Sequence, residues 1–303
     1  MQMVPDKQDH AQRVHKAKMI PMSCSMETPS ANNVPADVIR SSSFPKRHPL
    51  LNYFCLTLLI SWSGALAVAF PDLSRGHAVS KLAGILMFPA MLLGPSISGI
   101  VLTILVDGKV GLRGLMHRML RWRVTPKWFA LLLLPPVVLL LVLYCLQFTV
   151  SAAFSPNHFY IGIFFGIPAG ILEEIGWTGY AYPKMLAKWN PLWSAVLLGL
   201  LWSLWHLPVI NFLGASVPHG HYWLHFFLAF ALAMTAMRVL ICWLYRSTES
   251  VLLAQLMHIT STGALVIFSP PVSPGAEAMW YAIYGCALWL VAGVVIRIVG
   301  RDL

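Results

Sequence analysis

The chain has 303 residues, of which 58% are hydrophobic and only 11% are charged. A soluble domain is about 45–50% apolar and about 25% charged, so this composition excludes an ordinary water-soluble fold. The net charge of +10 would suit a nucleic-acid-binding protein, but the placement of the basic residues argues against that class.

Residues 1–47 are polar and basic and show no apolar periodicity. This predicts a disordered basic cytoplasmic tail. No apolar core follows the basic residues before Leu50, so the pattern is not that of a signal peptide. Residues 48–303 form the predicted transmembrane domain.

The rest of the chain is divided into apolar runs, and a membrane-spanning helix needs about 20 such residues at ~1.5 Å each. Strands of a membrane barrel would alternate polar and apolar residues, whereas residues 128–145 are apolar on all sides. We predict an all-α membrane protein, a polytopic bundle of about eight transmembrane helices. The predicted spans are 50–70, 82–106, 128–154, 159–182, 191–213, 222–245, 251–268 and 278–296.

The basic residues predict the orientation of the chain. With a cytoplasmic N-terminus, eighteen of the 21 Lys and Arg fall in cytoplasmic segments, as the positive-inside rule requires. Arg75 and Lys81 fall outside, and Arg238 lies near the cytoplasmic end of the sixth span, from which it can snorkel. We predict a multi-pass integral membrane protein with both termini in the cytoplasm. Its partner is the lipid bilayer and not nucleic acid.

A basic amphipathic helix is predicted between the second and third spans. Apolar residues recur there at helical spacing with Arg and His off the stripe, which predicts a helix on the cytoplasmic leaflet. We interpret it as a topology anchor rather than a specific lipid or partner site. The apolar stripe is Leu112, Leu115, Met116, Met119 and Leu120.

Only two of the eleven carboxylates, Glu173 and Glu174, fall inside an apolar span. An acidic residue at the centre of a membrane helix costs about 2.5–3.5 kcal/mol, so the pair must face a cavity or partners. Adjacent helical positions differ by about 100°. We expect one carboxylate to reach a reacting water while the other orients a neighbouring donor or helix. A buried polar link between helices is the structural alternative.

Two of the eleven histidines, His206 and His258, lie well inside spans. A pair of histidines with a pair of carboxylates favours activation of water, and we predict that all four side chains converge on one polar cavity open to the cytosol. The positions within the spans place Glu173 nearer the cytoplasmic face than His206. Pro208, two residues after His206, is predicted to kink its helix.

Other metal or nucleophile motifs are weak or missing. The histidines at 219, 221 and 225 lie in a predicted external loop with no carboxylate nearby in sequence, which indicates surface or interfacial residues. The five cysteines are scattered and predict neither a disulfide framework nor a zinc knuckle. The sequence has no HExxH, GxSxG, GxGxxG or P-loop pattern.

At the glutamates and histidines the sequence resembles the CAAX protease and bacteriocin-processing family (CPBP, also called Abi), which includes type II CAAX prenyl endopeptidases. The resemblance covers roughly residues 50–300, with its motifs at 173–262. The family signatures EExxxR, FxxxH and HxxxN or HxxxD read here as Glu173-Glu174-Ile-Gly-Trp-Thr178, Trp202-Ser-Leu-Trp-His206 and His258-Ile-Thr-Ser-Thr262.

The resemblance implies an intramembrane endopeptidase with Glu173 as general base and Glu174 as a supporting carboxylate. By the same resemblance His206 orients the water and His258 contributes to the oxyanion site. Thr178 replaces the motif arginine and Thr262 replaces the motif Asn or Asp. With Trp202, these two threonines are the supporting residues of the predicted site.

The sequence leaves the metal and the substrate open. Glu173, Glu174, His206 and His258 have the chemistry to bind zinc, and the same groups can act without a metal. The resemblance implies a peptide or protein substrate, with a prenylated C-terminus as the first candidate. The alternatives are a catalytically attenuated membrane scaffold or immunity and regulatory protein, and a proton-coupled transporter, although no two related halves are visible.

Overall fold

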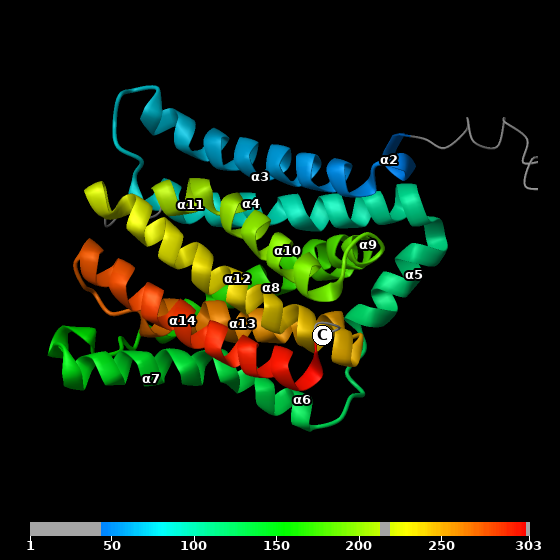
Figure 1. Cartoon of the computed structure of the whole chain (residues 1–303). Helices are drawn as coiled ribbons and strands as arrows, with labels where there is room; N and C mark the ends of the chain where they lie inside the picture. The colour runs from blue at the N-terminus through cyan, green and yellow to red at the C-terminus, as the bar shows by residue number, and fades with distance from the viewer. Residues whose placement is uncertain (1–43, 213–218, 301–303) are drawn as a thin grey trace, which may run out of the picture. The chain divides into compact units, whose positions relative to one another are not determined.

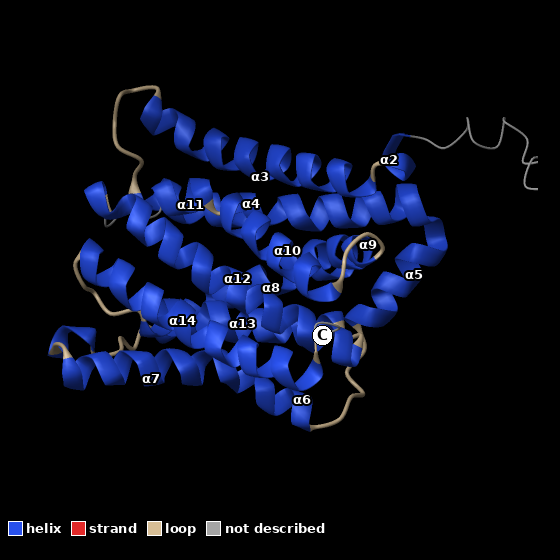
Figure 2. Cartoon of the chain, in the orientation of Figure 1, coloured by secondary structure: helices blue, strands red, loops and turns tan. Residues whose placement is uncertain are grey.

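The computed structural model describes residues 44–212 and 219–300, and within these ranges the chain is helical and has no strand (Figure 2). Among these described residues, seven helical stretches are long and apolar enough to cross a membrane. This confirms the predicted all-α polytopic bundle. The stretches are Pro49–Leu73, Lys81–Met119, Lys127–Thr149, Tyr160–Leu186, Gly220–Thr248, Val251–Phe268 and Pro274–Val299.

Figure 1 shows α3 at one edge of the helical unit and α7 at the opposite edge, with α8 between them in this view. The α-helices are α2 Phe44–Arg47, α3 Pro49–Leu73, α4 Lys81–Leu102, α5 Gly108–Met119, α6 Lys127–Ala130, α7 Leu134–Thr149, α8 Ile163–Gly176, α9 Tyr182–Leu186, α10 Pro191–Trp205, α11 Leu207–Phe212, α12 Trp223–Thr248, α13 Val251–Phe268 and α14 Pro274–Val299. Thr103–Asp107 and Trp177–Ala181 are π-helical, and four 3₁₀ turns are Leu131–Leu133, Ala152–Phe154, Tyr160–Gly162 and Gly220–Tyr222.

Of the predicted tail, residues 1–43 lie outside the described residues, and residues 44–47 form the short helix α2. The predicted boundary at residue 47 stays a prediction. Helix α3 begins at Pro49, where a proline is tolerated because the first N–H groups of a helix have no intrahelical acceptor.

Four helices begin at a polar cap. The side chain of the N-cap residue accepts a hydrogen bond from a backbone N–H of the first turn, which satisfies one of the donors left free at a helix start. In α10 and α14 the cap is followed by proline, whose fixed φ suits the first helical position. The caps of α4, α10, α13 and α14 are Ser80, Asn190, Ser250 and Ser273.

The fifth predicted span, 191–213, is not one helix. Helix α10 ends at Trp205, His206 is its C-cap, and α11 begins at Leu207. The break follows from Pro208, which has no backbone N–H and whose ring would clash with the carbonyl four residues earlier. Neither piece alone is long enough to span a membrane, and the predicted span is divided into two helices next to the kink expected at Pro208.

Glycines allow α8 to pack closely against two neighbours. A Cβ at Gly176 would lie 2.3 Å from the carbonyl oxygen of Pro95 on α4, and a Cβ at Gly170 would lie 2.5 Å from that of Gln255 on α13. Small residues at such contacts let membrane helices approach backbone to backbone. Pro168 lies inside α8 without ending it. This packing places the carboxylates of α8 between α4 and α13.

The amphipathic segment forms α5, as predicted, but it packs against the bundle. Leu115 is fully buried, and its side chain occupies the space beside Gly179. The Arg118 Nη2 atom donates to the Gly179 carbonyl at 2.9 Å. Helix α5 is therefore docked under the π-helical segment that follows α8, whereas Leu120, at the end of the predicted stripe, is exposed.

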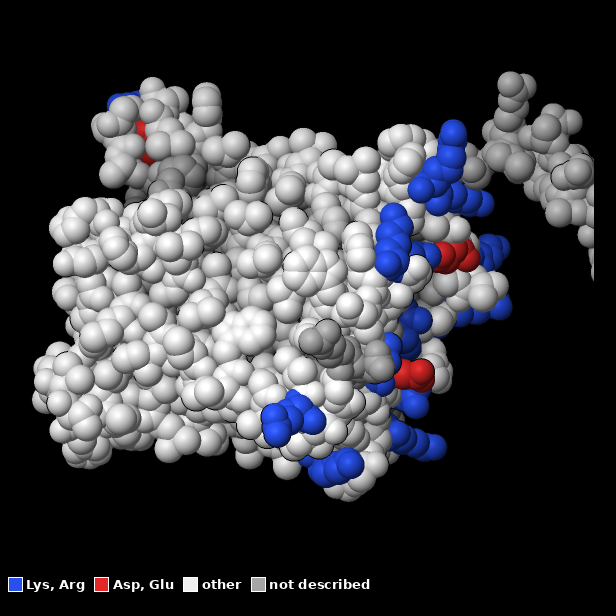
Figure 3. All heavy atoms as spheres, viewed as in Figure 1, with Lys and Arg blue, Asp and Glu red and all other residues white. Residues whose placement is uncertain are grey.

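Basic side chains gather at one end of the helical unit. In Figure 3 most blue atoms lie at the end that carries α2, α5 and α6, and the opposite end is nearly free of charge on the face shown. Two carboxylates on this end are paired with basic residues, Asp107 with Lys184 at 2.5 Å and Glu249 with Arg121 at 2.7 Å. This one-sided distribution supports an integral membrane protein, and the cytoplasmic side of the termini stays a prediction.

Candidate active site

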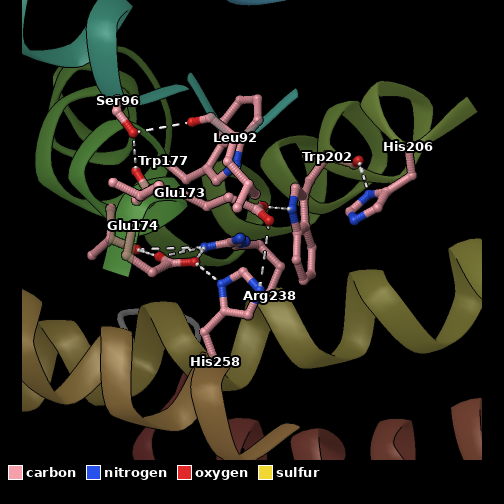
Figure 4. Close-up of polar contacts among 11 residues, drawn as sticks. Leu92, Ser96, Glu173, Glu174, Trp177, Trp202, His206, Arg238 and His258 are labelled. Atoms are coloured by element: carbon pink, nitrogen blue, oxygen red, sulfur yellow. Dashed lines mark hydrogen bonds and ion pairs between the residues drawn. The ribbon is translucent and has the colours of Figure 1, made fainter. Parts of the chain in front are cut away.

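The two glutamates are completely enclosed by the bundle. Glu173 and Glu174 lie in the last turn of α8 and are 1% and 0% exposed. Because consecutive residues of a helix point in different directions, each carboxylate has its own set of partners. Figure 4 shows Glu173 directed toward Trp202 and Glu174 toward Arg238 and His258.

Glu173 is held by two tryptophans. The indole Nε1 atoms of Trp202 and Trp177 donate to its Oε2 atom at 2.7 and 3.2 Å. An indole N–H can only donate, and both contacts therefore favour the ionised carboxylate. The Oε1 atom accepts from neither indole and faces His258.

Glu174 is held by a charge and a hydroxyl. The Arg238 Nη1 atom lies 2.9 Å from its Oε1 and 2.8 Å from its Oε2, and the Thr178 hydroxyl also donates to Oε2. Arg238 comes from α12 and Thr178 from the π-helical segment after α8. A buried carboxylate is costly unless it is paired and hydrogen-bonded, and here both conditions are met.

His258 connects the two carboxylates. Its Nδ1 atom lies 2.7 Å from Glu174 Oε1, and its Nε2 atom lies 4.0 Å from Glu173 Oε1. An ionised carboxylate only accepts hydrogen bonds, so Nδ1 carries a proton, and Nε2 is an acceptor when the ring is neutral. The orientation of the imidazole is therefore fixed by Glu174.

The 4.0 Å separation between Glu173 Oε1 and His258 Nε2 exceeds a hydrogen bond. It suits a water molecule hydrogen-bonded to both atoms. Glu173 Oε1 and the unprotonated His258 Nε2 are both acceptors, so such a water would donate one O–H to each of them. The lone pairs of its oxygen would then point away from both side chains. The arrangement can therefore hold and deprotonate a nucleophilic water.

Arg238 corrects one prediction. It does not snorkel to the cytoplasmic interface, since it is 0% exposed and its guanidinium carbon lies 4.2 Å from the centre of the Trp202 ring. Within the part of the chain that the structure describes, its Nε and Nη2 atoms have no hydrogen-bond partner. Buried donors without a partner are rare and indicate a place for water or a ligand oxygen.

Sequence reasoning missed Arg238 and Trp177 as members of the site. A signal for Arg238 was present, because it is the one Lys or Arg inside a predicted span, and a lone intramembrane charge requires a partner of opposite sign. Trp177 lies four residues after Glu173, the spacing at which helical side chains meet. Both residues could have been proposed from these two rules.

The four predicted residues do not all meet. Glu173, Glu174 and His258 come together, whereas His206 lies beyond the Trp202 indole (Figure 4). The His206 ring contacts those of Trp202 and Trp205, and its Nδ1 donates to the Trp202 carbonyl at 2.8 Å. This agrees with the positions in the spans, which placed His206 nearer the external face than Glu173.

The three supporting residues predicted from the sequence also differ in whether they contact the glutamates. Trp202 and Thr178 donate directly to the two carboxylates. Thr262 lies one helical turn beyond His258 on α13 and is half-buried, and it takes no part in the hydrogen bonds that join His258 to the glutamates. Its predicted place in the cavity therefore stays a prediction.

The residues proposed for zinc do not form a metal site. Among residues 44–212 and 219–300, no group of three or more His, Cys, Asp or Glu could hold a metal ion. The arginine on Glu174 is a positive charge where a cation would bind, and His206 lies behind an indole. The donor set does not fit the tetrahedral arrangement that zinc prefers.

The histidine cluster of the 219–225 segment also differs from the prediction. His219 is only 7% exposed, and its Nε2 atom pairs with Glu277 of α14 at 3.0 Å. The carboxylate is distant in sequence but close in space, which is why sequence reasoning did not find it. His221 and His225 are exposed, as predicted.

Comparison with known proteins places this site in a matched segment. Residues 155–263 match the family described as type II CAAX prenyl endopeptidase Rce1-like. A curated relative, CAAX prenyl protease 2 of Methanococcus maripaludis, is 30% identical over 139 residues, which cover 42% of this chain and 51% of the relative. The chain thus spans about half the length of that relative. The matched segment contains both glutamates, His206 and His258.

Proposed function

We propose, on the basis of these matches, that this chain is a member of the CAAX protease and bacteriocin-processing family and an intramembrane endopeptidase that hydrolyses a peptide bond with a water activated by Glu173. The observation that carries this proposal is the 4.0 Å separation between Glu173 Oε1 and His258 Nε2. The two atoms face each other and are fixed by different partners. A preorganised pair of this kind needs no rearrangement to bind water.

The proposed reaction assigns one role to each group. The water donates one O–H to Glu173 and the other to His258, and its oxygen attacks the carbonyl carbon of the peptide. Glu173 takes the proton as the C–O bond forms and gives it to the leaving amine nitrogen as the C–N bond breaks. Glu174 orients His258, and His206 positions Trp202 through its backbone and ring contacts.

The relative's name provides the first substrate to test. It is called a prenyl protease, and we propose a peptide with a prenylated C-terminus as the first candidate substrate. The proposed reaction itself requires only a peptide bond that can reach Glu173 and His258.

A cleavage assay tests the proposal. The purified chain in liposomes is incubated with prenylated and unprenylated C-terminal peptides and with a broad peptide panel, and products are identified by mass spectrometry. We expect cleavage at one defined bond. A folded, monodisperse chain that cleaves nothing in this panel would contradict the proposal.

One observation favours a second candidate, a membrane scaffold without protease activity. Glu173, Glu174 and His258 are at most 1% exposed, and their contacts link α8, α10, α12 and α13 as a structural polar network would. The cleavage assay separates the two candidates, because a scaffold without protease activity cleaves nothing in the peptide panel.

A further inference from the structure

The first signature of the resemblance, EExxxR, requires an arginine four residues after its second glutamate. This chain has Thr178 at that position. Thr178 is fully buried, and its hydroxyl donates to the Oε2 atom of Glu174. The position therefore still contacts the second glutamate, but it brings no charge.

A positive charge reaches the same carboxylate from another helix. The Arg238 Nη1 atom contacts both oxygens of Glu174, at 2.9 and 2.8 Å, and lies 3.5 Å from the Thr178 hydroxyl. The guanidinium and the hydroxyl thus share one carboxylate oxygen. A short side chain at 178 leaves room for the guanidinium, whereas an arginine there would compete for the space.

The packing of α12 against α10 holds Arg238 level with Glu174. A Cβ at Gly199 would lie 2.7 Å from the Thr235 Cα and 3.2 Å from the Arg238 Cβ, so the two helices touch where α10 has no side chain. Less than one turn further along α10, Trp202 presents its ring to the guanidinium at 4.2 Å. The same indole donates to Glu173.

From this geometry we propose that Arg238 is the positioning residue that replaces the motif arginine, transferred from the helix of the glutamates to α12. Its charge fixes Glu174, Glu174 fixes the imidazole of His258, and the ring presents Nε2 toward Glu173. Thr178 and Arg238 are a matched pair of changes, and the threonine does not mark a degraded site. The inference rests on the proposed function only in its effect on cleavage.

A charge exchange tests this inference in two readouts, thermal unfolding in detergent and cleavage. Arg238→Gln should lower Tm by about 5 °C or more, because it leaves a buried carboxylate without its cation. Adding Thr178→Arg to that variant should recover at least half of the loss. Thr178→Arg in the native background should instead lower Tm, because two guanidinium groups then crowd one carboxylate. Arg297→Gln, which removes an exposed charge at the end of α14, is the matched control and should change neither readout.

Cleavage adds a readout that a purely structural role would not produce. Arg238→Gln should lower kcat by up to about 100-fold, the loss that a small misplacement of a catalytic group can cause, with KM changed much less. The double variant should regain kcat with Tm. The inference would be overturned if Arg238→Gln lowers Tm and the addition of Thr178→Arg lowers it further. If Arg238→Gln does not accumulate, Arg238→Lys is used instead to show that a positive charge at this position suffices. If the double variant Arg238→Gln with Thr178→Arg does not accumulate either, while Arg238→Lys behaves like the native chain, the inference is overturned.

The two readouts keep this inference separate from the proposed function. A native chain without cleavage on the peptide panel contradicts the protease proposal alone. The sign of the Thr178→Arg effect in the two backgrounds still decides whether Arg238 stands in for the motif arginine.

Discussion

Glu173 and Glu174 show how two identical side chains acquire different chemistry from their neighbours. The indoles on Glu173 leave one carboxylate oxygen facing the imidazole, whereas both oxygens of Glu174 are occupied by Arg238, Thr178 and His258. A proton acceptor must have a lone pair free for water. The contacts therefore favour Glu173 as the base and Glu174 as the residue that orients His258.

The first prediction concerns Glu173. Glu173→Gln keeps the shape and burial of the side chain but removes the proton acceptor, and it should lower cleavage by at least about 10²-fold while leaving Tm within a few degrees. Glu277→Gln is a matched control, because it removes a partly buried carboxylate that pairs with His219 away from the site. Native-like turnover by a folded Glu173→Gln variant would contradict the assignment.

The second prediction separates the two histidines. His258 contacts Glu174 directly, whereas His206 contacts the backbone and ring of Trp202. His258→Ala should reduce cleavage by about 10²-fold or more, the lower range for positioned acid–base groups, and His206→Ala should reduce it less. Steady-state kinetics of both variants in liposomes measures the order, and a larger loss in His206→Ala would show that the water binds on its side of the indole.

The third prediction concerns metal. Since a guanidinium lies against Glu174 and His206 is separated from the carboxylates, cleavage should be unchanged after dialysis against a chelator. The assay is repeated with added zinc as a control. Activity that is lost on dialysis and restored by zinc would require the side chains to rearrange around a metal ion.

At the scale of the helices, close packing of α8 determines where the carboxylates lie. Gly176 meets the carbonyl of Pro95 and the hydroxyl of Tyr53 at distances that leave no room for a methyl group. Membrane helices lack a hydrophobic driving force for association and depend on such contacts. A small displacement of α8 would move both glutamates away from α12 and α13.

The fourth prediction tests this packing. A Cβ at Gly176 would lie 2.3 Å from the Pro95 oxygen, so Gly176→Ala should destabilise the protein by about 1–3 kcal/mol through overpacking. Gly293→Ala on α14 is the matched control, because nothing lies within 4 Å of its Cβ and alanine gains up to about 1 kcal/mol in a helix. Thermal unfolding should move in opposite directions for the two variants, and equal shifts would contradict the close approach.

At the scale of the whole molecule, the basic residues distinguish one end of the helical unit from the other. Lys and Arg gather at the end that carries α2, α5 and α6 (Figure 3). Helix α5 at that end is attached to the residues after α8 through Arg118 and Leu115. Helix α5 and the segment that carries Thr178 therefore form one packed region.

The fifth prediction concerns topology. Reporter fusions at the C-terminus and in the 107–127 segment should both show a cytoplasmic location, because eighteen of 21 Lys and Arg lie on that side in the predicted arrangement. A fusion after residue 77, between α3 and α4, should report the opposite side. An external location for the 107–127 segment would reverse the orientation.

The class of protein and most of its helices could be predicted from the amino-acid pattern alone. Long apolar runs can satisfy their backbone groups in a bilayer only as helices or closed barrels, and the lack of alternation excluded barrels. The burial of Glu173 and Glu174 followed from the cost of intramembrane charge. Pro208 predicted a distortion, although the complete break at His206 depends on where α10 and α11 pack.

The tertiary structure decided which polar groups meet. Arg238 and Glu174 are 64 residues apart, and His219 and Glu277 are 58 apart, so no local pattern could pair them. His206 and His258 have the same side-chain chemistry and both lie inside predicted spans, yet only His258 reaches the carboxylates. Contacts between distant helices depend on interhelical distance and rotation, which glycines such as Gly176 and Gly199 set and which the order of residues along one helix does not encode.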